Sequence, residues 1–261
     1  MRDFFEQPDE PERPDPLEAA RRAMRPQARK RFYDVVGVAE GEGAFALLLD
    51  GRPVKTPASR ALAAPVRALA EALAEEWRAQ RDVIEPASMP LTRLANSIID
   101  GVADARDKVF AEVANYVACD LVFYRASAPD GLVARQRAAW GPLIEWAAER
   151  LGARFVTAED MIHVAQSETA LVAARAAIEA GAGGSIWRLG ALHSVTTLTG
   201  SALIALALAH GRLGVEDAWA AAHVDEDWNM ERWGKDALAL ERRAYRHAEM
   251  AAAAAVLDAT R

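Results

Sequence analysis

Hydrophobic and polar residues alternate along the segment 31–56, which is the pattern of half-buried strands. The alternating apolar positions are Phe32, Val36 and Val38, followed by Phe45, Leu47 and Leu49. Asp50-Gly51 comes directly after the second run, and this dipeptide suits the positive φ angles of a tight hairpin turn. The segment therefore predicts a β-hairpin.

Beyond residue 56, apolar residues recur every three or four positions, as they do on one face of a helix. The first such stretch begins at Pro65 and ends near Arg81, and Val83-Ile84 is predicted to return as a strand. Gly101 is predicted to stop the helix that begins near Leu91. The other predicted helices cover 105–120, 132–151, 168–180, 185–210, 215–232 and 236–259, and a short β excursion is predicted within 153–166.

This pattern divides the chain into three parts and predicts the α+β class. Residues 1–30 are charged and rich in proline, which is typical of a disordered arm, with a short helix at 17–25. Residues 31–88 are predicted to form a small β-hairpin domain that carries one helix. Residues 89–261 are predicted to form a mainly helical domain, in agreement with 59 alanines in a chain of 261 residues.

Composition excludes several classes of protein. The formal net charge is −7, whereas a protein that binds nucleic acid needs a basic face. Cys119 is the single cysteine, so an internal disulfide is excluded and a reducing compartment is favoured. Residues 1–16 lack the apolar core of a secretory signal, and the strongly apolar run 202–209 is too short to span a bilayer. A soluble protein without membrane insertion is predicted.

Motifs for catalysis are absent from the sequence: there is no P-loop, nucleophile elbow, HExxH or strand–GxGxxG–helix pattern. His223 and Asp227 are four residues apart and could supply two metal ligands, but two ligands do not make a site, and solvated helix residues are predicted instead. His193 is predicted to form a hydrogen bond in or near the core. Core packing is predicted for Trp77, Trp140, Trp146 and Trp187.

The segment 215–234 is the most informative. It holds six acidic residues between Glu216 and Glu231 and no Lys or Arg, so its like charges are not balanced within the helix. On one continuous helix, a single stripe is formed by Val215, Trp219, Ala222, Met230 and Trp233. Glu226 falls in the middle of that stripe.

Two explanations of Glu226 remain open. It is either a buried carboxylate paired with an arginine of another helix, or a carboxylate on an open face that waits for a cation or amide of a partner. Aromatic residues around one charge are typical of a binding hot spot. The predicted partner-binding residues are Glu226, Asp225, Asp227, Trp219, Trp228, Met230 and Trp233. No catalytic residue, cofactor or metal is predicted.

Five ordered blocks of the chain resemble one known family, the assembly chaperones of the F-type ATP synthase catalytic head that are specific for its alpha subunit. This family occurs in mitochondria and alphaproteobacteria. The blocks are LDGRPVKTPA (49–58), EWRAQRDVIEPASMPLTRLANSIID (76–100), DLVFYR (120–125), QRAAWGPLIEWA (136–147) and DEDWNMERWG (225–234).

The resemblance implies a protein that is not an enzyme and needs no ATP. It would bind the unassembled alpha subunit, prevent its aggregation and release it to the beta subunit, as a monomer in the bacterial cytoplasm (the mitochondrial matrix is the eukaryotic equivalent). The family's essential glutamate aligns with Glu226, with Asp225 and Asp227 as alternatives, and Trp77 is expected to be structural. The alternatives to this function are a small metal-dependent hydrolase around His223, Glu226 and Asp227, or a binding module for another client.

Overall fold

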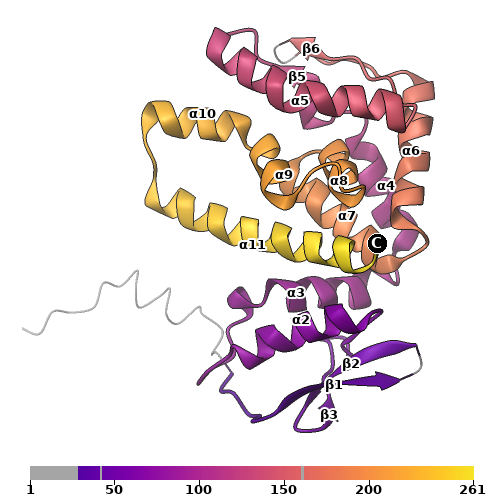
Figure 1. Ribbon diagram of the computed structural model, residues 1–261, viewed down its shortest axis with the longest axis vertical. Coiled ribbons are helices and arrows are strands. Elements are labelled where there is room, and N and C mark those ends of the chain that lie inside the picture. The colour runs from indigo at the N-terminus through magenta and orange to yellow at the C-terminus, as the bar shows by residue number, and fades with distance from the viewer. Residues whose placement is uncertain (1–28, 42, 160–161) are drawn as a thin grey trace, which may run out of the picture.

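The computed structural model describes residues 29–41, 43–159 and 162–261. Most of the predicted arm, including its helix at 17–25, lies outside these described residues. Figure 1 shows a small strand region at one end of the molecule and a stack of helices over the rest. The α+β class, with a strand-containing N-terminal part before a mainly helical part, is confirmed.

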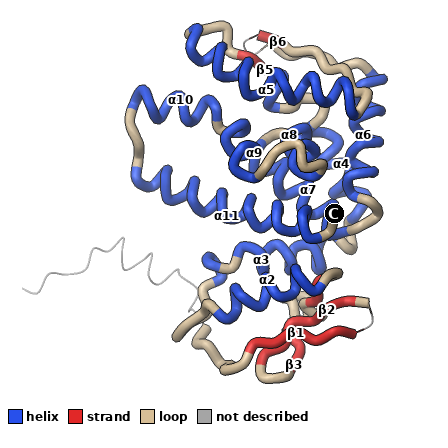
Figure 2. Tube along the Cα trace, viewed as in Figure 1, coloured by secondary structure: helices blue, strands red, loops and turns tan. Residues whose placement is uncertain are grey.

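The strand region is a short antiparallel sheet built around the predicted hairpin (Figure 2). β1 pairs along its whole length with β2, and the other edge of β2 pairs with β3 and β4. The turn between β2 and β3 is Asp50-Gly51, with φ angles of 48° and 76°, as the sequence predicts. The strands are β1 (Val36–Gly41), β2 (Ala44–Leu49), β3 (Arg52–Pro53) and β4 (Ala63–Ala64).

One helix, α2 (Arg67–Arg78), packs against this sheet. It buries Leu69 and Leu73 completely, in keeping with the predicted apolar face. The helix begins and ends two to three residues inside the predicted limits. The predicted strand at 83–84 is reduced to a single bridge between Lys30 and Val83.

The rest of the described chain is helical apart from two short strands. Its elements are η1 (Pro86–Ser88), α3 (Pro90–Ser97), η2 (Ile98–Val102), α4 (Arg106–Tyr116), η3 (Leu121–Phe123), β5 (Tyr124–Arg125), α5 (Asp130–Arg150), β6 (Ala158–Glu159), α6 (Glu168–Ala182), α7 (Ile186–Thr199), α8 (Ala202–Ala209), α9 (Val215–Ala222), α10 (Val224–Trp233) and α11 (Ala237–Ala259). β5 and β6 pair in parallel, so the predicted β excursion exists. Gly101 does not stop the helix after α3, because the π-helical turn η2 carries it on to Val102.

The predicted helix at 185–210 is two helices. Gly200, with φ of 70°, ends α7 in the left-handed conformation, and the side chain of Ser201 caps α8 by accepting from the N–H of Ile204. Every residue of α8 is buried. α7 packs against α4, α6, α8 and α11, so α7 and α8 form the centre of the helical stack.

The predicted helix at 215–232 is also two helices, α9 and α10, with the break at His223. The imidazole Nδ1 of His223 lies 2.8 Å from the carbonyl oxygen of Trp219, the oxygen that the N–H of residue 223 would bind in a continuous helix. The backbone N–H of His223 donates to Ala220 instead. A side chain thus replaces the backbone at this carbonyl, and the chain bends.

One large buried cluster extends from Leu47 of the sheet to Leu203 of α8, and a smaller one contains Tyr33, Leu49, Ile84 and Met89. Core packing is confirmed for Trp140, Trp146 and Trp187, which are at most 9% exposed. The division of the chain at residues 88 and 89 stays a prediction. None of the described helices has both the length and the apolar character to cross a bilayer.

Candidate functional site

The helix α10 carries most of the predicted site residues and lies between α5 and α11 (Figure 1). Two polar links connect it to α5. Asp225 accepts a hydrogen bond of 2.7 Å from the Gln136 amide, and Glu231 accepts two hydrogen bonds from Arg135, at 2.8 and 2.6 Å. A bidentate arginine–carboxylate pair fixes orientation as well as distance. These contacts hold α10 against a defined stretch of α5.

The ring of Trp228 completes the contact with α5. The guanidinium groups of Arg135 and Arg232 lie 4.9 and 4.4 Å from the centre of the ring, so the indole has favourable contacts with two cations. Gly131 of α5 faces the edge of the ring, and a Cβ atom at that position would lie 2.6 Å from Cη2 of Trp228. Glycine is therefore required there for α10 to approach α5 this closely.

The other acidic residues of α10 face α11. Arg243 lies 3.2 Å from Oε2 of Glu226 and 2.6 Å from Oδ1 of Asp227, and its side chain is only 19% exposed. The same guanidinium lies 5.6 Å from the centre of the Trp219 ring of α9. Arg243 thus connects α9, α10 and α11 through one cation.

The predicted stripe on one continuous helix is wrong, because the break at His223 turns α10 away from α9. Trp219 is buried and stacks on the His223 imidazole with ring centres 3.8 Å apart, whereas Trp233 is 87% exposed. Glu226 is not buried: its side chain is 58% exposed. Of the two explanations, pairing with an arginine of another helix is observed, but burial is not.

His223 is a buried structural residue, and the prediction of a solvated histidine is wrong. Since a carbonyl can only accept, Nδ1 carries the proton that is donated to Trp219. Burial lowers the pKa of His223, although the hydrogen bond to Trp219 and the charge of Glu226 oppose this effect. Nε2 lies 3.9 Å from Glu226. Among the residues that the structure describes, no group of three or more His, Cys, Asp and Glu side chains could hold a metal ion.

The outer ends of α10 and α11 carry exposed apolar side chains. Trp233 ends α10, and Leu238, Leu240 and Tyr245 follow on α11, with exposures of 87%, 66%, 38% and 41%. We call Trp233, Leu238 and Tyr245 the apolar patch; Leu240 is two residues from Leu238 and therefore lies on another side of α11. Met230, one turn before the end of α10, is half-buried. Charges of both signs are exposed around the patch, on Glu231, Arg232, Lys235, Asp236, Glu241 and Arg242.

The sequence analysis found Trp233 but missed the three α11 residues and Arg243. Helical periodicity gives no signal for them. Leu238 and Tyr245 share one side of α11 with Ala252 and Val256, which are buried further along the helix. The pattern alone would therefore assign Leu238 and Tyr245 to the core, and only the structure shows that they are exposed.

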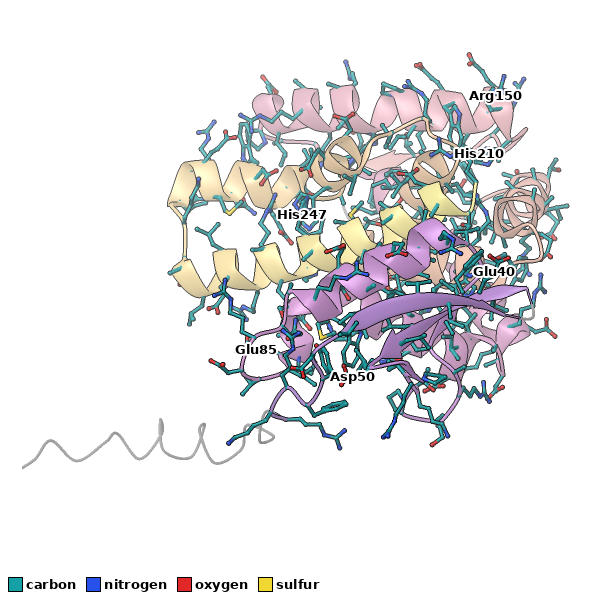
Figure 3. The ribbon with its side chains drawn as sticks, turned by 60° about the horizontal axis from the view of Figure 1, so that its bottom comes forward. Glu40, Asp50, Glu85, Arg150, His210 and His247 are labelled. Carbon is teal, nitrogen blue, oxygen red and sulfur yellow. The ribbon has the colours of Figure 1, made fainter. Side chains whose placement is uncertain are left out.

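The prediction for His193, unlike that for His223, is confirmed. His193 of α7 is 29% exposed in its side chain, and its Nε2 lies 3.0 Å from Oε2 of Glu112 on α4, which confirms a hydrogen-bonded histidine near the core. His247 of α11 faces α9, where its Nε2 lies 3.1 Å from Glu216 (Figure 3). Both residues connect helices.

The chain is similar in sequence and in structure to known chaperones. The family model described as "ATP12 chaperone protein" matches residues 30–148. The Atu1473 protein of Agrobacterium tumefaciens, described as a candidate chaperone, is 46% identical, with a TM-score of 0.85 over 96% of this chain and 93% of that chain. Atp12 of Paracoccus denitrificans is 42% identical, with a TM-score of 0.81 over 89% of this chain and 99% of that one. A mutant of the Paracoccus protein, in which lysine replaces an aspartate, is 41% identical and matches with a TM-score of 0.81.

Proposed function

The chain belongs to the ATP12 chaperone family, and from this premise we propose that it is an ATP-independent assembly chaperone for the alpha subunit of the F-type ATP synthase. It binds the unassembled alpha subunit, prevents its aggregation and releases it to the beta subunit. It acts as a monomer in the bacterial cytoplasm, without a cofactor. The proposal joins the family resemblance to a binding surface on α10 and α11.

The observation that carries the proposal is the apolar patch. An unassembled subunit exposes apolar surface that its neighbour normally covers, and such surface drives aggregation. A chaperone that works without ATP needs a complementary apolar surface of its own. Trp233 and Tyr245 supply large aromatic side chains, the residue type that dominates binding hot spots. Exposed charges of both signs around them would set the register of the client.

The acidic residue Glu226 of α10 adds an accessible charge to the proposed binding surface. The closest contacts of Glu226 to His223 and to Arg243 are both made by Oε2, and within the described chain Oε1 accepts no hydrogen bond. We assign Oε1 to a cation or amide on the alpha subunit. Asp225 and Asp227 already bind Gln136 and Arg243, so their role is to hold α10 in place.

Release requires no nucleotide in this proposal. The sequence contains no nucleotide-binding motif. If the beta subunit covers the same apolar surface of the alpha subunit, its arrival displaces the chaperone by competition. The chaperone then has to bind the alpha subunit less tightly than the beta subunit does in the assembled ring.

The decisive experiment is the turbidity of isolated alpha subunit with an equimolar amount of the full chain and no ATP. The expected result is a clear solution, a complex of both proteins in gel filtration, and loss of the chaperone from that complex when beta subunit is added. An alpha subunit that aggregates at the same rate with and without the chain would overturn the proposal.

Metal analysis of the same purified protein tests the alternative of a metal-dependent hydrolase around His223, Glu226 and Asp227. A stoichiometric metal would support that alternative and contradict ours. Pull-down from a lysate tests the remaining alternative. If the dominant partner is not an ATP synthase subunit, the chain is a binding module for another client.

A further inference from the structure

A shallow groove of about 320 Å³ lies on the side of α5 that faces β5 and β6. Val133, Arg137, Gly141 and Glu145 line it from α5, four residues apart from one another, and so share one face of that helix. A Cβ atom at Gly141 would meet no atom within 4 Å, so this position leaves the floor of the groove open. Arg135, which binds α10, points to another side of α5, so the groove is separate from the apolar patch.

Arg125 of β5 forms the inner wall of the groove. Its Nη1 donates a hydrogen bond of 2.8 Å to the carbonyl oxygen of Gln136, and its guanidinium lies 5.0 Å from the centre of the Trp140 ring. These contacts fix the orientation of the guanidinium. Burial lowers the pKa of Arg125 to about 10, and the positive charge of Arg137 acts in the same direction. Two like charges therefore act on each other here, one on the half-buried Arg125 and one on the exposed Arg137.

Among residues 29–41, 43–159 and 162–261, no acidic group lies within ion-pair distance of Arg125 or Arg137. Glu159, the cross-strand neighbour of Arg125, lies beyond that distance as well. A half-buried arginine normally has a carboxylate or phosphate partner, because removing its charge from water is costly. Here the partners of Arg125 are the Gln136 carbonyl and the Trp140 ring, and the charge that acts on its guanidinium is the like charge of Arg137.

We propose that the groove between α5 and β5–β6 is a binding site for a single oxyanion, held by Arg125 and Arg137. The planar guanidinium matches the geometry of a carboxylate and of a phosphate equally well. The oxyanion is therefore the carboxylate of a peptide or a free phosphate. The proposal does not depend on the alpha subunit being the client.

The two glutamates of the groove restrict the ligand further. Glu145 lies two helical turns from Arg137, about 12 Å along the axis of α5, and Glu159 approaches from β6. Their charges repel an extended polyanion such as a nucleic acid or a polyphosphate. A ligand with one negative group near the arginines, and with a neutral or positive part beyond it, suits this arrangement.

The experiment is a titration of the full chain with sodium phosphate and, separately, with sodium acetate at constant ionic strength. Binding is followed by NMR at the Nε–H groups of Arg125 and Arg137. We expect saturable shifts at both groups. Arg137→Gln should weaken binding about tenfold, the scale of one charge-assisted contact. This residue is exposed, so the substitution spares the fold.

The matched control is Arg150→Gln, the same substitution at the C-terminal end of the same helix and outside the groove (Figure 3). It should leave the affinity unchanged. Glu145→Gln should strengthen binding, because it removes a like charge. Acetate that binds at least as tightly as phosphate identifies a peptide carboxylate, and a preference for phosphate identifies a free phosphate. Shifts that do not saturate with either anion, or equal affinity in Arg137→Gln, would overturn the proposal.

Discussion

Arg243 lies 2.6 Å from the carboxylate of Asp227, and this ion pair joins α11 to the first turn of α10. The Arg243 side chain is 19% exposed and that of Asp227 is 37% exposed, so the pair is sheltered from solvent. Glu226 approaches the same cation at 3.2 Å, but with a side chain that is 58% exposed. The two acids thus differ in role: Asp227 holds the helices together, and Glu226 remains accessible to a partner.

This difference predicts that Glu226→Lys folds but loses protection of the alpha subunit. Arg243 keeps Asp227 as its partner, and an exposed pair contributes less than about 1 kcal/mol to stability. Urea unfolding should therefore show a free energy of unfolding within about 1 kcal/mol of the wild type. The turbidity assay should show aggregation of the alpha subunit close to that without chaperone.

Glu226→Lys both removes a carboxylate and adds a cation next to Arg243, whereas Glu226→Gln only removes the negative charge, so comparing the two variants separates these effects. Glu226→Gln should protect better than Glu226→Lys, because the amide oxygen still accepts hydrogen bonds. A Glu226→Lys variant that protects as well as the wild type would remove this residue from the mechanism. Unfolding of that variant would show that Glu226 is structural.

The apolar patch predicts a second set of variants. Trp233→Ala and Leu238→Ala remove side chains that are 87% and 66% exposed, so the free energy of unfolding should change by no more than about 0.5 kcal/mol. Both should raise the turbidity of the alpha subunit in the equimolar assay. Val172→Ala is the control, since Val172 is 55% exposed on α6, away from the patch. Equal protection by all three variants would exclude the patch as the binding surface.

Two glycines of α5 predict different effects of the same substitution. Gly131→Ala places a Cβ atom 2.6 Å from Trp228, so α10 has to shift, at a cost of about 1–3 kcal/mol. Gly141→Ala meets no atom within 4 Å beyond its own neighbours in the helix, but Pro142 follows it and disfavours helical backbone for a residue with a Cβ. The gain in helix propensity is then offset, and the free energy of unfolding should change by less than about 1 kcal/mol. Urea unfolding of both variants measures the contrast. If Gly131→Ala does not destabilise the protein, Trp228 does not fix the distance between α5 and α10.

The sequence predicts local structure well where one residue type determines the backbone. Asp50-Gly51 forms the expected turn, because its positive φ angles suit few other residues. α11 covers the predicted range, since its alanines and its capping Asp236 agree with each other. The break at His223 was not predictable in this way. It depends on a hydrogen bond from an imidazole to the Trp219 carbonyl, which periodicity does not reveal.

The candidate site shows the same limit. The acidic segment indicates Glu226 as a site residue. The periodicity of one continuous helix placed it on the same face as Trp219 and Trp233, whereas in the structure Trp219 is buried on α9 and Trp233 is exposed at the end of α10. The partner of the acids is Arg243, 17 residues away from Glu226 in a different helix. Only the packing of α10 against α11 determines that pairing. Which surface binds a client stays a prediction until the variants are measured.

A buried carboxylate provides a prediction on pH. Asp120 is fully buried, and its two oxygens accept hydrogen bonds from the N–H groups of Val122 and Leu203, at 3.2 and 3.0 Å. It therefore connects η3 to the first turn of α8. Burial raises the pKa of Asp120 to about 6, although these bonds and that of Ser201 favour the charged form.

The sign of the effect follows from proton binding. Between about pH 4 and pH 6 the folded protein keeps a proton on Asp120 that the unfolded chain has lost, so the contribution of this group to stability falls as the pH rises. The loss amounts to about 3 kcal/mol and is nearly complete at about pH 7, one unit above the pKa in the folded protein. Asp120→Asn does not titrate at this position. The stability of the wild type relative to Asp120→Asn should therefore fall between pH 4 and pH 7 in urea unfolding, and a difference that rises with pH would show that the hydrogen bonds at Asp120 outweigh its burial.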